Sequence, residues 1–262
     1  MILDMEYIEY FHLYRMWNKY DVIWDNIKPD VNILVGINGA GKTTLLNNIY
    51  DYYSKLIGSS HKITIQSRFE ATDTNIPIEY IRSFDIPSST KKNTNSPLMA
   101  ELNKVVYQNP ERLSFFDYLM RSYHFSNEAE RVKGRVSELF DVVNTFFSDT
   151  NKRIDFESAT NKLVFIGKDA DIITLDMLSA GEKQLLLILM TVFLMDEQPY
   201  VLLMDEPELS LHIEWQRQLI KSIRRLNKKC QLFLTTHSPS IFATGWQDKL
   251  VYMEDITKTS QK

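Results

Sequence analysis

The sequence is poor in cysteine and glycine, carries little net charge and has no long hydrophobic run. Cys230 is the single cysteine among 262 residues, which excludes an internal disulfide. The longest largely apolar run, Leu185 to Met195, is interrupted only by Thr191 and falls short of the roughly 20 residues that cross a bilayer. A net charge of −4 argues against a chain that coats nucleic acid nonspecifically, although it does not exclude a local basic face. We expect no membrane span.

The first residues also differ from those of a secreted protein. Asp4, Glu6 and Glu9 stand where a signal peptide carries basic residues and then an apolar core. With 44% hydrophobic residues, the chain can bury a sizeable core without disulfides. We therefore expect a globular, cytoplasmic protein.

Hydrophobic periodicity predicts an α/β fold. Alternating residues and then the apolar "VNILVG" indicate two outer strands and one buried strand within residues 1–35, followed by a helix over 44–57. Strands return before Leu178, and buried strands "YVLLMDE" and "CQLFLTTH" then alternate with helices, which favours a mixed sheet with a parallel core flanked by helices. We predict a core from residues 1–58 and 150–262 and an inserted strand and helical lobe over 59–149.

The segment "GINGAGKT" has the phosphate-loop pattern, directly after a buried strand and before a helix. Glycines let backbone N–H groups point at phosphates, Lys42 reaches the β- and γ-phosphates, and the Thr43 hydroxyl binds Mg²⁺. An ordinary glycine turn is a poorer explanation, because the chain has only eight glycines. The predicted nucleotide contacts come from Asn38, Gly39, Ala40, Gly41, Lys42, Thr43 and Thr44.

A carboxylate that orders Mg²⁺ is expected on a neighbouring strand, and "YVLLMDEP" ends in Asp205 and Glu206. We assign Asp205 to the metal and Glu206 to the attacking water as catalytic base. Without the phosphate loop, two solvated acids at a strand end would be the simpler interpretation.

The segment "LSAGEKQ" resembles the signature motif of ABC-type ATPases. The resemblance implies that Ser179, Gly181 and the adjacent Glu182 bind the γ-phosphate of a nucleotide held by a second subunit. A helix start with unpaired N–H groups is physically suited to an anion. Ser179 and Glu182 also have the spacing of a helix capping box, and both roles are compatible.

His237, at the end of the next buried strand, matches the switch histidine of the same family. Alone it would be interpreted as a structural hydrogen-bonding residue. The order of phosphate loop, signature, acidic strand and histidine makes the resemblance specific, and it implies a homodimer around two ATP molecules with Mg²⁺. Lys42, Glu206 and His237 are then the predicted catalytic residues.

The segment "PELSLHIEWQ" is similar to the version in the overcoming-lysogenisation-defect (OLD) and RecF-like group of predicted AAA family ATPases. This resemblance puts Glu208, Ser210 and His212 at the dimer interface, and Ser210 is also a candidate N-cap of the next helix. Little sequence follows the final strand, so we expect no nuclease domain like that of OLD proteins.

Two assignments stay open at this level. The glutamine that links magnesium to the helical lobe in ABC proteins is Gln66, or with less support Gln108. Tyr20 and Trp24 are candidates to stack on adenine, and both are equally compatible with packed core aromatics.

The insertion resembles standalone ATPases of bacterial anti-phage systems, including the Septu and retron-associated types. This resemblance implies a switch that controls a separate effector protein, such as a nuclease. The alternatives are a RecF-like repair ATPase that binds DNA, a transporter ATPase subunit, and a scaffold that binds ATP without hydrolysis. The lobe also carries four basic residues that are candidates to contact nucleic acid, although charged helix faces are more often simply solvated. These residues are Arg121, Arg131, Lys133 and Arg135.

Overall fold

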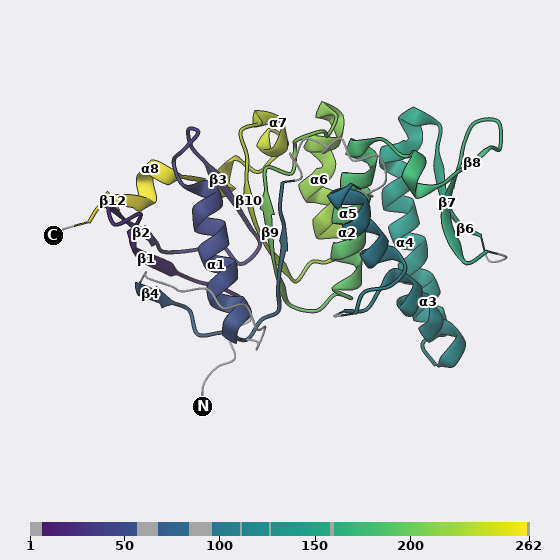
Figure 1. The fold of residues 1–262 in the computed structure, drawn as a ribbon, viewed down its shortest axis with the longest axis horizontal. Coiled ribbons are helices and arrows are strands. Elements are labelled where there is room, and N and C mark those ends of the chain that lie inside the picture. Colours follow the sequence, from purple (N-terminus) through teal and green to yellow (C-terminus); the bar gives the residue numbers. More distant parts are fainter. Residues whose placement is uncertain are drawn as a thin grey trace.

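A five-stranded parallel sheet, in the order β11-β3-β10-β9-β5, forms the centre of the molecule (Figure 1). The computed structural model describes residues 7–56, 68–83, 96–110, 112–125, 127–157 and 160–260. The strands of the sheet are β3 (Val31–Val35), β5 (Ile78–Ile81), β9 (Tyr200–Asp205), β10 (Cys230–Thr235) and β11 (Leu250–Tyr252). Because every pair is parallel, the carboxyl ends of β3, β9 and β10 lie at one edge.

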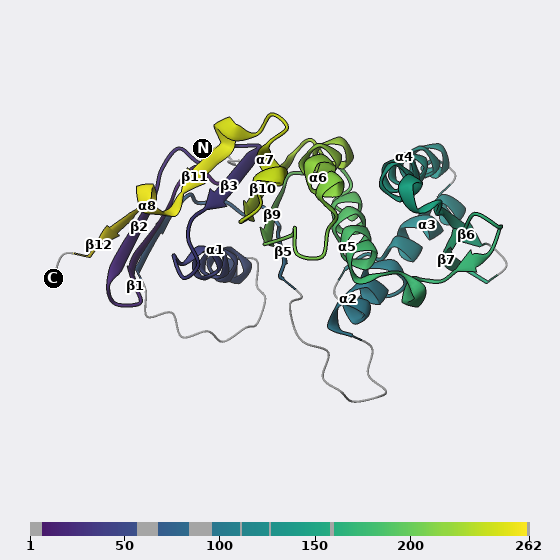
Figure 2. The same ribbon diagram turned by 90° about the horizontal axis from the view of Figure 1, so that it is seen from above.

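Alternate residues of the buried strands face two different hydrophobic layers. Val201 and Leu203 of β9 pack with α1 (Lys42–Leu56), whereas Leu202 and Met204 face α5 (Ala180–Leu194) and α6 (Ile213–Leu226). Figure 2 shows α1 on one side of the sheet and α5 and α6 on the other. Coverage of both faces explains why these strands are continuous apolar runs.

A second, antiparallel sheet has the order β12-β2-β1-β4 and borders α1. Its strands are β1 (Phe11–Met16), β2 (Tyr20–Trp24), β4 (Arg68–Ala71) and β12 (Thr257–Thr259), with the short α8 (Met253–Ile256) before β12. The β1–β2 turn has positive φ at Trp17 and Asn18, 54° and 56°, which turns the chain sharply beside the phosphate loop.

The lobe consists of three helices and a small antiparallel sheet, β6-β7-β8, at the end of the molecule far from β12 (Figure 1). Its apolar residues belong to the same hydrophobic cluster as those of α5 and the central sheet. The ring centroids of Tyr118, in the lobe, and Phe193, in α5, lie 4.8 Å apart. The lobe therefore shares the core of the central sheet. Its elements are α2 (Pro97–Val106), α3 (Phe115–His124), α4 (Ala129–Phe147), the 3-10 turn Ser148–Thr150, β6 (Arg153–Glu157), β7 (Lys162–Ile166) and β8 (Ile172–Ile173). The remaining short elements are the 3-10 turns Leu175–Met177 and Gln247–Lys249 and the helix α7 (Pro239–Phe242).

The predicted fold class is confirmed, whereas the division of the chain differs from the expected one. β4 and β5 come from the range 59–149, yet they pair with β1 and β9 of the core. β6 to β8 come from the range 150–262, yet they pair with one another, and β6 packs on α4. Short strands carry no local signal for their partners, so sequence pattern places them in order but not in a sheet.

One capping prediction is wrong. Ser210 does not cap α6; it has φ 71° and lies in the turn before the helix. His212 is the N-cap, and its Nδ1 accepts from the Glu214 N–H at 3.4 Å. The tight turn after β9 takes up Ser210, so the helix starts three residues later, at Ile213.

Candidate functional site

The phosphate-loop segment connects β3 to α1 and lies at the carboxyl edge of the parallel sheet. Gly39 and Gly41 have φ of 81° and 96°, values that favour glycine. A Cβ on Gly41 would also lie 2.9 Å from Met16 Cε and 3.0 Å from Trp17 Cη2. Positive φ and close packing on the β1–β2 turn together account for glycine at position 41.

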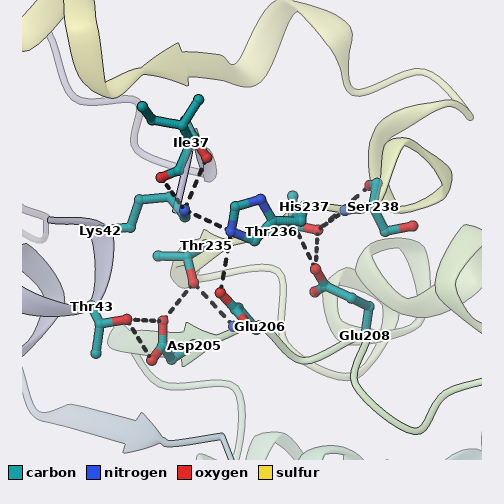
Figure 3. Close-up of polar contacts among 11 residues, drawn as sticks. Ile37, Lys42, Thr43, Asp205, Glu206, Glu208, Thr235, Thr236, His237 and Ser238 are labelled. Carbon is teal, nitrogen blue, oxygen red and sulfur yellow. Dashed lines mark hydrogen bonds and ion pairs between the residues drawn. The ribbon is translucent and has the colours of Figure 1, made fainter. Parts of the chain in front are cut away.

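Lys42 points into this loop and is 5% exposed. Its ammonium group donates to Gly36 O at 3.0 Å and Ile37 O at 3.2 Å, and it contacts His237 Nε2 at 2.8 Å (Figure 3). A charged ammonium can only donate, so in this contact Lys42 is the donor and His237 Nε2 the acceptor. Burial lowers the pKa of Lys42, while the negative charge of Glu206 and its neighbours opposes that shift.

Thr43 and Asp205 bring oxygen atoms together from two different elements. The Thr43 hydroxyl lies 3.0 Å and 2.9 Å from Asp205 Oδ1 and Oδ2, and the Thr235 hydroxyl donates to Oδ1 at 2.7 Å. A hydroxyl beside a carboxylate held by a neighbouring strand is a hard-oxygen donor set. It fits Mg²⁺, which takes one or two protein ligands and keeps its other positions for water and phosphate oxygens.

Glu206 follows Asp205 in a left-handed conformation, with φ 46°. Its N–H bonds to the Thr235 hydroxyl at 3.0 Å and to Thr235 O at 3.2 Å. The carboxylate is 29% exposed, and its Oε1 lies 3.4 Å from His237 Nε2. The side chain is thus fixed at its base and open to solvent at its tip.

The signature segment opens α5 with a complete capping box. The Ser179 hydroxyl accepts from the Glu182 N–H at 3.3 Å, and Glu182 Oε2 accepts from the Ser179 N–H at 2.8 Å. Lys152 donates to Glu182 Oε1 at 2.6 Å. Burial would raise the pKa of Glu182, but the bonds from Lys152 and Ser179 outweigh it and lower the pKa. Ser179 is exposed.

The structure gives the Glu182 side chain a role within its own subunit, and its contact with a nucleotide stays a prediction. Its side chain is buried, and both carboxylate oxygens are held by groups of the same chain. Gly181 is buried against the turn after β9, where an added Cβ would lie 2.2 Å from Ser210 O. In the described part of the chain, no hydrogen bond joins Ser179 or Gly181 to the phosphate loop.

The remaining predicted residues are placed as follows. Asn38 and Gly39 of the loop are exposed, and Ala40 and Thr44, the latter in the first turn of α1, are half-buried. Gln66 lies outside the described residues. Gln108 is exposed in the connection between α2 and α3.

The structure decides one of the two aromatic assignments that the sequence left open. Trp24 is 2% exposed and packs edge-on against Phe233, so it belongs to the core. Tyr20 is half-buried in β2. Trp17 was not predicted, although it is 53% exposed and contacts the position of Gly41. An aromatic residue before the turn residues Asn18 and Lys19, in a hairpin that precedes the phosphate-loop strand, is the signal that was overlooked.

Sequence reasoning also missed the supporting threonines. Thr235 binds Asp205, and Thr236 binds the buried carboxylate of Glu208. The doublet before His237 is the signal, because hydroxyls at a buried strand end need acceptors.

Of the four basic residues weighed as contacts to nucleic acid or as solvated surface charges, Arg135 is buried against Glu138 and Leu226 O. Arg131 pairs with Asp196, and Lys133 with Glu130.

The part of the chain that the structure describes contains no group of three or more His, Cys, Asp or Glu side chains arranged to hold a metal ion. Likewise, none of its helices combines the length and apolar character that crossing a bilayer requires.

The chain is similar to proteins of one ATPase group. Residues 117–243 match the family described as "AAA domain, putative AbiEii toxin, Type IV TA system". Septu protein PtuA of Bacillus thuringiensis is 22% identical to this chain in an alignment 281 residues long. The alignment covers 86% of this chain and 70% of PtuA. The chain thus resembles ATPase subunits of the group predicted from its motifs.

Two solved structures share the fold. One is the SmcHead bound to the C-winged helix domain of ScpA, with a TM-score of 0.56, 14% identity and 97% of each chain covered. The other is an Smc head domain bound to the C-terminal domain of ScpA derived from Pyrococcus furiosus, with a TM-score of 0.52, 13% identity, and 97% of this chain and 96% of that chain covered. The fold is that of a P-loop NTPase of the ABC type.

Proposed function

We propose that this chain is an Mg²⁺-dependent ATP hydrolase that dimerises around two ATP molecules and, as a switch, controls a separate effector in anti-phage defence. The observation that carries the proposal is the convergence of Lys42, Thr43, Asp205, Glu206 and His237 where β3, β9 and β10 end. These side chains come from three separate parts of the sequence, and their chemistry is complementary to a magnesium nucleotide.

Each residue has a distinct task in this proposal. Lys42 and the loop N–H groups bind phosphate oxygens, and Trp17 stacks on the base from the neighbouring turn. Magnesium held by Thr43 and Asp205 would neutralise charge on the β- and γ-phosphates. Glu206 takes a proton from the attacking water at its open carboxylate, and His237 orients the water or the γ-phosphate.

Dimerisation is supported by the exposed start of α5. Ser179 is exposed at this start and accepts the Glu182 N–H; in the proposal its O–H group, which interacts with the Glu182 carboxylate in this structure, donates to an anion instead. The first N–H groups of α5 add to that anion site. Since these groups make no hydrogen bond to their own phosphate loop within the described ranges, their partner in the proposal is the nucleotide of a second copy.

A few such contacts are enough for a switch. One hydrogen bond to a charged group contributes roughly 1.5–3 kcal/mol. Contacts made only in the closed dimer therefore shift the equilibrium by orders of magnitude, and hydrolysis reverses the shift.

Control of a separate effector is supported by the resemblance to PtuA and to standalone defence ATPases. We infer that the effector is a nuclease.

Native mass spectrometry of Glu206→Gln protein tests the proposal. The variant is purified with ATP and Mg²⁺ from cells that carry its neighbouring genes. The purified complex should contain an even number of these chains plus a second protein. Lys42→Ala should lose ATP binding and serves as the control that cannot close. A bare dimer that gains mass only with DNA would refute the effector and favour a repair ATPase.

Steady-state turnover tests the catalytic part. Glu206→Gln should bind ATP and lose most hydrolysis, because an amide cannot take the proton. Wild-type turnover in this variant would remove Glu206 as the base. Ser179→Arg should bind ATP as a monomer and fail to dimerise, and normal ATP-dependent dimerisation would contradict the shared site.

A further inference from the structure

The turn from Glu206 to Ser210 holds a buried carboxylate that the proposed reaction does not use. Glu208 is 8% exposed. Its Oε1 accepts from the Thr236 hydroxyl at 2.7 Å and from the His237 N–H at 2.8 Å (Figure 3). A charge-assisted bond to a backbone N–H is strong and directional. Glu208 therefore fixes the peptide from which the His237 ring projects toward Lys42 and Glu206.

The second oxygen of this carboxylate is less well satisfied. Glu208 Oε2 is buried, and within the described residues it has no hydrogen-bond partner. A buried carboxylate with one orphaned oxygen costs free energy, so packing alone gives no reason for glutamate at this position. The two bonds made by Oε1 go to Thr236 and His237, which directly follow β10 at the edge of the sheet where Lys42 and Glu206 lie.

The other end of the same turn contacts the start of α5. Ser210 O occupies the space where Gly181 would carry a Cβ, and the Gln184 side chain donates to Pro207 O at 3.1 Å. A displacement of the first turn of α5 must therefore move the turn from Glu206 to Ser210. Because Glu208 lies inside that turn, the displacement reaches His237 through two hydrogen bonds.

We propose that Glu208 is a positioning residue, whose Oε1 sets the location of His237 and transmits movement of the α5 start to it within one subunit. The inference rests on the proposed function, since it gives the signature segment a route to its own nucleotide site. The transmitted quantity is the position of the His237 ring relative to Lys42 Nζ and Glu206.

Two substitutions separate the hydrogen bonds from the charge. Glu208→Gln keeps an acceptor at the position of Oε1 and removes the charge. Glu208→Asp keeps the charge and withdraws the acceptor by one methylene. Asp196→Asn is the matched control, because Asp196 Oδ1 also accepts two bonds, from Tyr118 and Arg131 of the lobe, but follows the far end of α5.

Histidine ¹⁵N NMR in the absence of nucleotide gives the direct readout. The chain has five histidines, and a His237→Gln spectrum assigns the signal. Glu208→Asp should shift the His237 ring signals and lower kcat roughly tenfold or more, with the affinity for ATP changed by less than about threefold. Glu208→Gln and Asp196→Asn should retain the wild-type His237 signals.

Unchanged His237 signals in Glu208→Asp would overturn the inference, as would equal displacement in Glu208→Gln. If Glu208→Asp does not fold, any displacement of the His237 signals from their wild-type positions in folded Glu208→Gln protein would overturn the inference. Gly181→Ala should also shift His237, whereas Gly134→Ala should not. Because the spectra need no ATP, they remain decisive if the wild-type protein fails to hydrolyse it, a result that would refute only the proposed function.

Discussion

Two glycines, both in helices, should respond to alanine with opposite signs. Gly134 lies on the exposed side of α4, and a Cβ there would meet no atom within 4 Å. Gly134→Ala should raise the free energy of unfolding by about 0.5–1 kcal/mol, because alanine loses less backbone entropy in a helix. Gly181 gains a similar amount at most, but its Cβ would lie 2.2 Å from the backbone oxygen of Ser210.

A backbone oxygen cannot rotate away, so Gly181→Ala forces α5 and the turn after β9 apart. Overpacking of this kind costs about 1–3 kcal/mol, so a propensity gain of about 0.5–1 kcal/mol leaves a net loss of up to about 2.5 kcal/mol. In a chain of this size that loss corresponds to a fall of up to roughly 10 °C in Tm. Thermal unfolding of both variants and the wild type measures the difference. Gly181→Ala protein that is as stable as Gly134→Ala would refute the close contact.

Three further outcomes follow from the site and its surroundings. Lys152→Met should lower the free energy of unfolding by about 2–3 kcal/mol at neutral pH, because it leaves Glu182 buried without its cation. The loss is smaller than for a fully buried ion pair, since Lys152 is partly exposed. The pKa of Glu182 is lowered in the folded protein. The stability that this ion pair contributes is therefore present above the pKa of Glu182 in the unfolded chain, and it is lost as the pH falls through its pKa in the folded protein. Acid unfolding of the wild type and of Lys152→Met tests this direction, and parallel curves of stability against pH would contradict it. ATP should quench the fluorescence of Trp17, and Trp17→Ala should abolish that quench and weaken ATP binding roughly tenfold, whereas an unchanged quench would exclude stacking. Burial raises the pKa of the Cys230 thiol to about 12, so a thiol reagent should label it only as the protein unfolds, and rapid labelling of the native protein would show that β10 opens.

Much of the candidate site can be predicted from sequence because its residues sit in local patterns. "GINGAGKT" specifies a glycine loop, a lysine and a helix start within eight residues, and "YVLLMDE" specifies a buried strand with acids at its end. The capping box of Ser179 and Glu182 is equally local, and the structure contains it. Parallel strands then bring Lys42, Asp205 and His237 together, because buried strands of one parallel sheet end at a common edge.

Contacts across long sequence separations were decided by tertiary structure. The Lys152 ion pair turns Glu182 inward, and the neighbouring Phe233 makes Trp24 a core residue. β5 joins the central sheet only because β9 offers it an edge. Glu208 gains its link to His237 from a turn that folds back on the end of β10. The sequence by itself determined which reactive side chains the protein has and which strand ends they follow, since both can be recognised from short segments of a few residues. Packing between distant segments decided which side chains face the site, because that choice depends on neighbours that local periodicity does not encode.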